Sequence, residues 1–152
     1  MTQRPRAEIA YAVEDYYDGP ESGFAEFRGG PHRFEVAQER WVRNRTVRLF
    51  RLYQVNQEHL HHALEQQRLW SRWNFAYRKG ELPNDLPYSE RVFPEDLNEY
   101  RALAARVEVH VPQLSATVIY AEGRFFVGRR TTAYRAFGEN LRVVWSRRRV
   151  AA

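Results

Sequence analysis

Strand-like patterns occupy both ends of this chain, and helix-like periodicity occupies its centre. Two central segments repeat apolar residues at helical spacing. The segments in which apolar and polar residues alternate, or in which β-branched and aromatic residues dominate, are residues 9–17, 24–28, 32–37, 46–55, 116–122, 124–128 and 140–147. This order predicts an α+β fold, with a mainly antiparallel sheet from the N- and C-terminal strands packed against two central helices.

Two glycine-containing positions mark the expected hairpins. The segments on either side of Gly29-Gly30-Pro31 alternate with period two, which predicts a β-hairpin there. The segments on either side of Gly123 are expected to form a second hairpin. In the strand predicted between them, Arg51 shares the parity of Val47 and Leu49, which interrupts the apolar alternation. A β-bulge or an edge position is therefore expected in residues 46–55.

The two central segments predict helices. The first is expected from about Gln57 to Lys79, with Gly80 ending it. Its apolar arc covers more than half of the helix circumference, which predicts burial against both a sheet and a second helix. The second helix is expected from Pro94 to about Val111. Residues 107–111 also alternate like a strand, so an end near Arg106 is the alternative.

Length and composition exclude several classes of protein. A chain of 152 residues is expected to form one domain, here residues 9–152 after a frayed segment of residues 1–8. The absence of cysteine excludes disulfide scaffolds, thiolate metal sites and cysteine nucleophiles. No apolar run approaches the ~20 residues needed to span a membrane. The first ten residues lack the apolar core of a secretory signal, so a cytoplasmic location without membrane association is expected.

One short stretch resembles known sequences. Tyr16-Tyr17-Asp18-Gly19-Pro20 is followed by Gly23, by the predicted hairpin and then by His32 and Phe34. This stretch of about twenty residues resembles the start of certain small bacterial proteins of unassigned function. The resemblance implies a β-rich N-terminal half and a bacterial source, and it implies no activity and no site residues.

Positive charge is concentrated in two segments. The formal net charge of the chain is +5, and nearly all of its basic residues are arginine. Residues 40–57 hold five arginines and no acid, and residues 124–149 hold eight arginines and one acid. The arginine bias runs through the whole chain, which favours a codon bias of a GC-rich genome as its origin. The two segments nevertheless polarise the protein and would steer an acidic partner if they met in space. The equally weighted alternative is that the basic strands pair with acidic residues elsewhere in the same fold.

The leading hypothesis is a non-enzymatic binding protein. Trp41 lies among arginines in a stretch without clear periodicity, and an exposed indole flanked by guanidinium groups resembles an interaction hot spot. An acidic surface, most simply that of another protein, is the expected partner. The proposed binding residues are Arg40, Trp41, Arg43, Arg45, Arg48 and Arg51, followed by Arg129, Arg130 and Arg135.

Nucleic acid is the alternative partner. Arginines alternate with aromatic residues around Tyr53 and Tyr134, and single strands bind to such mixtures by stacking their bases and pairing their phosphates. The opposing interpretation is that Phe50, Phe125 and Trp145 belong to the core, with their neighbours pointing outward. That interpretation is favoured because no signature of a nucleic-acid-binding module is present.

A metal-dependent enzyme is the third hypothesis. His59 and His62 are three residues apart on the predicted helix, a spacing that can direct two imidazoles to one ion. A third ligand is not evident, and partly buried histidines bonded to the backbone explain the pair equally simply. No nucleophile elbow or phosphate-binding glycine loop is present. We therefore assign no catalytic residue, cofactor or metal from the sequence.

Overall fold

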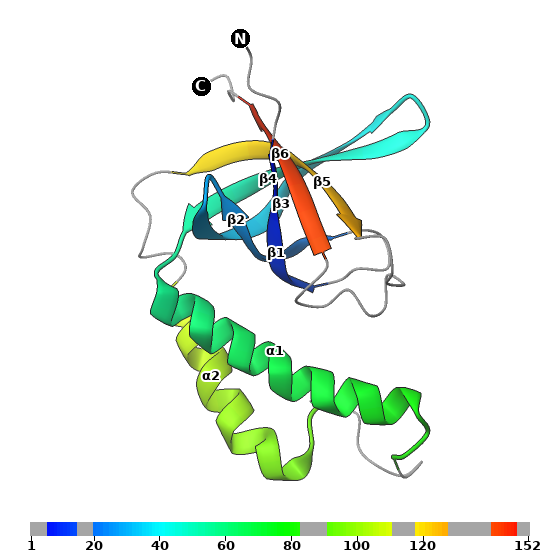
Figure 1. The fold of residues 1–152 in the computed structure, drawn as a ribbon, viewed down its shortest axis with the longest axis vertical. Coiled ribbons are helices and arrows are strands. Elements are labelled where there is room, and N and C mark those ends of the chain that lie inside the picture. The colour runs from blue at the N-terminus through cyan, green and yellow to red at the C-terminus, as the bar shows by residue number, and fades with distance from the viewer. Residues whose placement is uncertain (1–5, 15–19, 83–90, 111–117, 128–140, 149–152) are drawn as a thin grey trace. The chain divides into compact units, whose positions relative to one another are not determined.

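The computed structural model describes residues 6–14, 20–82, 91–110, 118–127 and 141–148 (Figure 1). Its elements, in chain order, are β1 (Ala7–Glu14), β2 (Ser22–Phe27), β3 (Gly30–Val42), β4 (Arg45–Gln54), α1 (Gln57–Arg78), the 3-10 turn η1 (Pro94–Asp96), α2 (Leu97–His110), β5 (Ile119–Val127) and β6 (Leu141–Arg148).

The six described strands form one closed antiparallel barrel, in which each strand pairs with the next along the chain. The last strand closes the barrel by pairing with the first, with Ala7 opposite Val144 and Ile9 opposite Arg142. The predicted fold class, an α+β sheet packed against two helices, is therefore wrong. Alternation shows that a strand has one apolar face, but it does not reveal what covers that face. Here the sheet curls until its own strands cover one another.

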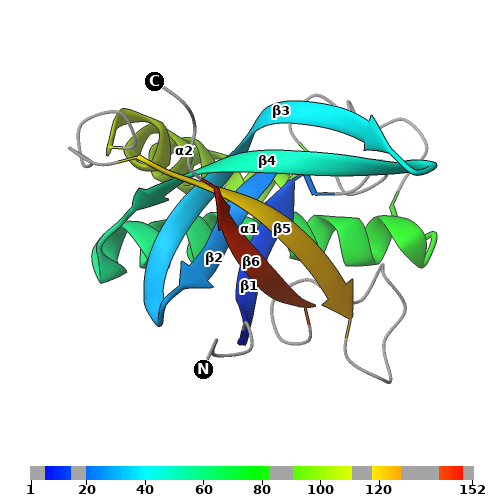
Figure 2. The same ribbon diagram turned by 90° about the horizontal axis from the view of Figure 1, so that it is seen from above.

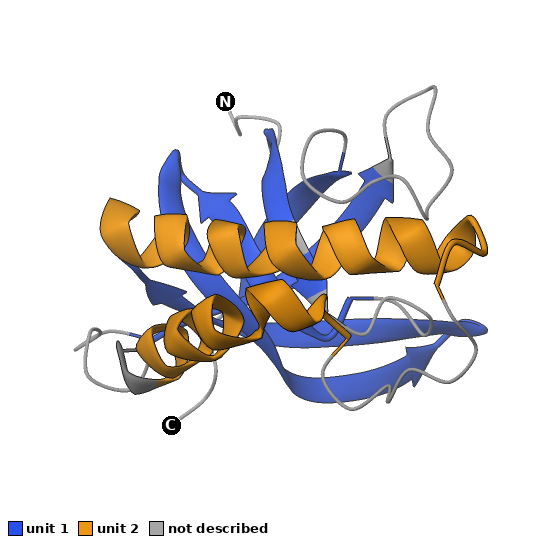
Figure 3. Cartoon of the chain, turned by 90° about the horizontal axis from the view of Figure 1, so that it is seen from below, with its two compact units in different colours: residues 1–56, 111–152 blue, residues 57–110 orange. Residues whose placement is uncertain are grey.

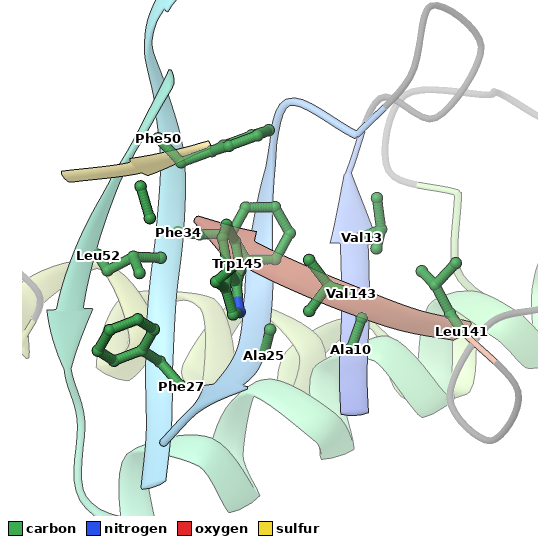
Figure 4. Packing of buried hydrophobic residues seen from close by; sticks show 11 residues of the cluster. Ala10, Val13, Ala25, Phe27, Phe34, Phe50, Leu52, Leu141, Val143 and Trp145 are labelled. Carbon is green, nitrogen blue, oxygen red and sulfur yellow. The ribbon is translucent and has the colours of Figure 1, made fainter. Parts of the chain in front are cut away.

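Side chains fill the interior of the barrel (Figure 4). The rings of Phe34, Phe50, Phe125 and Trp145 form its centre, with centroids 5.2 to 5.8 Å apart and mostly edge-to-face. The indole Nε1 of Trp145 donates to the carbonyl of Glu26 at 2.9 Å. Burying a side chain of this size stabilises the fold by ~2–3 kcal/mol. The interpretation of Phe50, Phe125 and Trp145 as core residues is confirmed.

β5 runs straight through Gly123, so the hairpin predicted at this glycine is wrong. Gly123 lies opposite Trp145 in the middle of the β5–β6 ladder. A Cβ atom at position 123 would come within 2.6 Å of the Trp145 ring. The glycine therefore provides space for the indole and does not form a turn, a role that glycine also plays in strand interiors.

The hairpin predicted around residues 29–31 is confirmed as β2–β3. Its two turn residues are Arg28 and Gly29, with φ of 52° and 78°, and Gly30 already belongs to β3. Positive φ at both turn positions gives the twist that joins two antiparallel strands. The carboxylate of Glu8 accepts a hydrogen bond from the Gly29 amide at 2.8 Å, which ties the turn to β1.

Residues 57–110 form a second compact unit, inserted in the chain between β4 and β5 (Figure 3). The long helix is confirmed as α1, and Gly80 follows it with φ of +69° and an amide that donates to the Tyr77 carbonyl. Within this unit α1 packs against α2 through a cluster that includes Leu69 and Leu103. α2 extends to His110, so the strand alternative for residues 107–110 is wrong, while Val111 lies outside the described residues.

Candidate functional site

β3 and β4 continue beyond their neighbours as a two-stranded arm (Figure 1; seen from above in Figure 2). Their pairing runs from His32 opposite Gln54 to Val42 opposite Arg45. β2 pairs with β3 only as far as Glu35, and β5 pairs with β4 only as far as Leu49. Residues 37–48 are therefore flanked by no other described strand, and we call them the arm.

The tip of the arm is a two-residue turn made by Arg43 and Asn44, with φ of 49° and 63°. These values are typical of a type I′ turn, whose twist matches that of the two flanking strands. Asn followed by Gly is the preferred pair of residues in such a turn. Asparagine tolerates the left-handed region, whereas a long side chain such as arginine is held there at a cost of about 1 kcal/mol. The turn thus places Arg43 at the outermost end of the arm.

An irregularity between Val36 and Gln38 sets which side chains share a face of the arm. The sequence predicts a bulge or an edge position in residues 46–55, but Arg51 of β4 pairs on both sides, with β3 and β5, and the irregularity lies in β3. Beyond it, Glu39 and Trp41 follow the face that carries Val36 and Phe50 inside the barrel, because side chains alternate along a strand. The residues on the opposite face of the arm are Gln38, Arg40, Val42, Arg45 and Val47.

Trp41 is the most exposed large apolar side chain described, at 71% of its full accessibility. Its neighbour Val42 is exposed at 38%. Trp41 lies directly across from Thr46, a small residue that covers little of the indole. An indole exposed to solvent at the end of a strand pair would gain free energy if a partner buried it. Tryptophan is also enriched among the residues that dominate the binding energy of protein interfaces.

Three of the arginines proposed from the sequence are paired with acids. Arg48 donates to Glu39 at 2.6 Å and to the Pro20 carbonyl at 3.3 Å, which fixes the base of the arm. Arg40 lies 3.4 Å from Glu122, whose other carboxylate oxygen is 3.1 Å from Arg148. Arg148 belongs to the second basic segment, so the two basic segments meet at one carboxylate.

Arg51 lies on the outer surface of the barrel, where its Nε is 3.4 Å from Glu35. The same carboxylate accepts a hydrogen bond from the Tyr53 hydroxyl at 2.9 Å. Partial burial, and then this hydrogen bond, raise the pKa of Tyr53 above its usual value. Arg51 and Tyr53 therefore form a surface network of the barrel and do not extend the arm.

Arg43 and Arg45 form no ion pair with any acid in the described part of the chain. Both are exposed at the tip, Arg43 in the turn and Arg45 opposite Val42. Of the proposed binding residues, the structure thus leaves Trp41, Arg43 and Arg45 exposed at the end of the arm, with Trp41 on one face, Arg43 in the turn and Arg45 on the other face. We call these three residues the tip cluster. Arg129, Arg130, Arg135 and Tyr134 lie outside the described residues.

The sequence leaves open that the basic strands pair with acids of the same fold, but it does not show which acids neutralise the arginines at the base of the arm. The pairing of Arg48 with Glu39 depends on the register of β3 and β4, and the turn at residues 43–44 sets that register. Asn44 was a usable signal, because asparagine is favoured in two-residue hairpin turns. Glu122 had no local signal, since it is separated from Arg40 by 82 residues.

His59 and His62 of α1 do not form a metal site with other described residues. His59 is buried, whereas His62 is partly exposed and its Nε2 lies 3.5 Å from a guanidinium nitrogen of Arg106. A cation beside a ring nitrogen opposes the binding of a second cation there. Among the residues that the structure describes, no group of three or more histidine and acidic side chains could hold a metal ion.

Comparison of the chain with models of protein families, with curated proteins and with solved structures gave no match. No helix in the described part of the chain has both the length and the apolar character needed to cross a membrane. The geometry of the arm is therefore the basis for a functional conclusion.

Proposed function

We propose that this chain is a non-enzymatic binding protein whose arm docks an acidic surface of another protein. The observation that carries the proposal is the tip cluster, in which an indole exposed at 71% on one face of the arm shares the end of the hairpin with two arginines, one in the turn and one on the other face, that have no acidic partner among the described residues. Tryptophan and arginine are the residues that most often dominate the binding energy of protein interfaces. A guanidinium also binds a carboxylate through two parallel hydrogen bonds.

The base of the arm supports this role because it is held in place. Arg48 joins the arm to the segment before β2 through Pro20, and Arg40 joins it to β5 through Glu122. A binding element whose geometry exists before the partner arrives loses less conformational entropy when the complex forms. The base arginines therefore position the tip cluster, and the tip cluster makes the contact.

The distribution of charge favours a protein over nucleic acid. A nucleic-acid track needs several free cations in a row, because affinity grows with the number of phosphates neutralised. Arg40, Arg48 and Arg51 are each paired with a carboxylate, which leaves two cations at the tip. Tyr53, proposed for base stacking, is hydrogen-bonded to Glu35 on the barrel. One indole and two cations suit a compact acidic patch.

The test compares two double variants with equal loss of charge. A photo-crosslinking side chain at Thr46, which faces Trp41, would capture the partner in cells of the source organism. We expect a crosslinked acidic protein from the native chain and none from the R43N/R45Q variant. The matched control is R124Q/R147Q, which removes two exposed arginines from the barrel. This control should crosslink like the native chain.

Two results would overturn the proposal. One is the same crosslinked protein from both double variants, since the tip arginines would then be irrelevant. The other is the recovery of RNA or DNA as the crosslinked species, together with oligonucleotide binding that weakens steeply with salt. That second result would establish the nucleic-acid alternative, with Trp41 as its stacking residue.

A further inference from the structure

The arm has two open edges. β5 pairs with β4 from Leu52 to Leu49 and then continues along β6 alone, so residues 45–48 of β4 have no described strand on that side. β2 reaches only to Glu35 of β3, so residues 37–42 are similarly open. An open strand edge carries a row of unpaired amide and carbonyl groups that can bind another strand.

The turn determines which backbone groups are free on each edge. In a two-residue hairpin the residues that flank the turn, here Val42 and Arg45, exchange both of their backbone hydrogen bonds. The bonding residues then alternate along the ladder. On β4 the amides and carbonyls of Thr46 and Arg48 therefore point away from β3, toward the open side.

The two edges differ in their protection. The β3 edge contains the irregularity after Val36, which interrupts the regular ladder that a further strand would need. Residues 45–48 of β4 contain no bulge, no proline and no acid. Arg45 lies on this edge, and the turn places Arg43 next to it. Within the described residues, the β4 edge is thus the regular one of the two, and Arg43 and Arg45 make its outer end positively charged.

We infer that the partner presents an acidic segment in extended conformation, which adds to β4 as a further antiparallel strand alongside residues 45–48. The inference rests on the proposed function and specifies how the partner binds. Backbone groups of Thr46 and Arg48 would hold the segment, while Arg45 and Arg43 would select its carboxylates. Trp41 would pack over the added strand across Thr46, whose small side chain leaves the indole accessible from this edge.

The test uses two synthetic peptides of about eight residues, in which Glu alternates with Val or Thr. The second peptide is identical except for N-methyl groups on the alternate amides that would face β4. N-methylation removes backbone donors and keeps every side-chain charge. We expect the first peptide to bind the full chain about tenfold or more tightly than the second. R43N/R45Q should weaken binding of the first peptide, and R124Q/R147Q should leave it unchanged.

A variant of the protein tests the same backbone hydrogen bonds by removing a donor from β4 instead of from the peptide. T46P removes the outward amide of Thr46, and proline is tolerated on strand edges where no ladder bond is lost. We expect T46P to weaken binding of the unmethylated peptide about tenfold. The circular dichroism spectrum and the melting temperature should stay close to those of the native chain. V47P, which would break the β3–β4 ladder, is the control for a damaged arm.

The outcomes separate the inference from the proposed function. Equal binding of both peptides, with a loss in R43N/R45Q, would overturn strand addition and leave an acid-binding tip. Binding that is insensitive to R43N/R45Q, or no binding of either peptide, would count against both. If T46P unfolds the protein, the comparison of the two peptides on the native chain still decides.

Discussion

Gly123 lies against the face of Trp145, so close that a Cβ atom at position 123 would come within 2.6 Å of ring carbon Cζ3 and 3.1 Å of Cε3. The indole cannot turn aside without losing its hydrogen bond to the Glu26 carbonyl and its contacts with Phe34 and Phe50. The packing of Trp145 at the centre of the barrel thus requires a residue without a Cβ atom at position 123.

G123A should destabilise the barrel by about 1–3 kcal/mol, because an added atom in a packed interior forces side chains or backbone to shift. Urea unfolding followed by tryptophan fluorescence would measure the change. G30A is the matched control, since a Cβ atom there meets nothing closer than 3.9 Å. Equal stability of the two variants would show that Trp145 is not held against Gly123.

R43N should remove a charge from the arm without weakening it. Asparagine adopts the left-handed backbone of position 43 at less cost than arginine, so the free energy of unfolding should stay the same or rise by up to about 1 kcal/mol. R43V should instead destabilise the turn, because a β-branched residue fits positive φ poorly. Thermal melts would compare the stabilities of the two variants. A higher melting temperature for R43V than for R43N would contradict the turn geometry.

R72Q should destabilise the helical unit. Arg72 lies 3.2 Å from the carboxylate of Asp96, which is only 7% exposed, and the variant would leave a buried charge without its cation. The expected loss is about 1–2 kcal/mol, reduced by the partial exposure of Arg72. The control is R68Q, which breaks the exposed pair with Glu65 and should change stability by less than about 0.5 kcal/mol. Similar losses in both variants would contradict this difference in burial.

Tyr11 should make the barrel sensitive to alkaline pH. Burial, and then the hydrogen bond from its hydroxyl to Glu26 at 2.6 Å, raise the pKa of Tyr11 to about 12. A pKa raised above the unfolded value of 10.0 means that the stabilisation is complete below pH 10. It is lost as the pH rises from about 10 to about 12.

The stability difference between the native chain and Y11F should therefore be constant at neutral pH and shrink across this alkaline range. Ultraviolet titration of tyrosinate should lose a step near pH 12 in Y11F. A difference that does not change up to pH 12 would show that the hydroxyl of Tyr11 titrates normally.

Hydrogen exchange should reveal the open β4 edge in the protein without a partner. The amides of Arg45 and Val47 face β3 and should be protected, whereas those of Thr46 and Arg48 should exchange quickly with solvent. Amide-resolved NMR would measure all four rates. Protection of Thr46 and Arg48 would mean that another part of the chain already covers this edge.

Local signals in the sequence were enough for several elements. The helical spacing of residues 57–78 and the glycine after it predict α1 almost to the residue, because both signals act within a few turns of the chain. The alternation around residues 29–31 predicts the β2–β3 hairpin for the same reason. The proximity of Trp41, Arg43 and Arg45 along the chain is also visible in the sequence, whereas the register of β3 and β4 decides which face of the arm each one takes.

Tertiary structure alone decided how the strands close and which arginines are neutralised. Pairing of β1 with β6 joins residues more than a hundred positions apart, and no local pattern distinguishes a curled sheet from one covered by helices. The midstrand glycine of β5 has the sequence signature of a turn, and only the Trp145 ring opposite it gives its role. Arg40 and Arg45 are alike in sequence, yet Glu122 pairs with the first across the barrel surface and leaves the second at the tip. Charge pairing depends on distance in space, and the fold sets that distance.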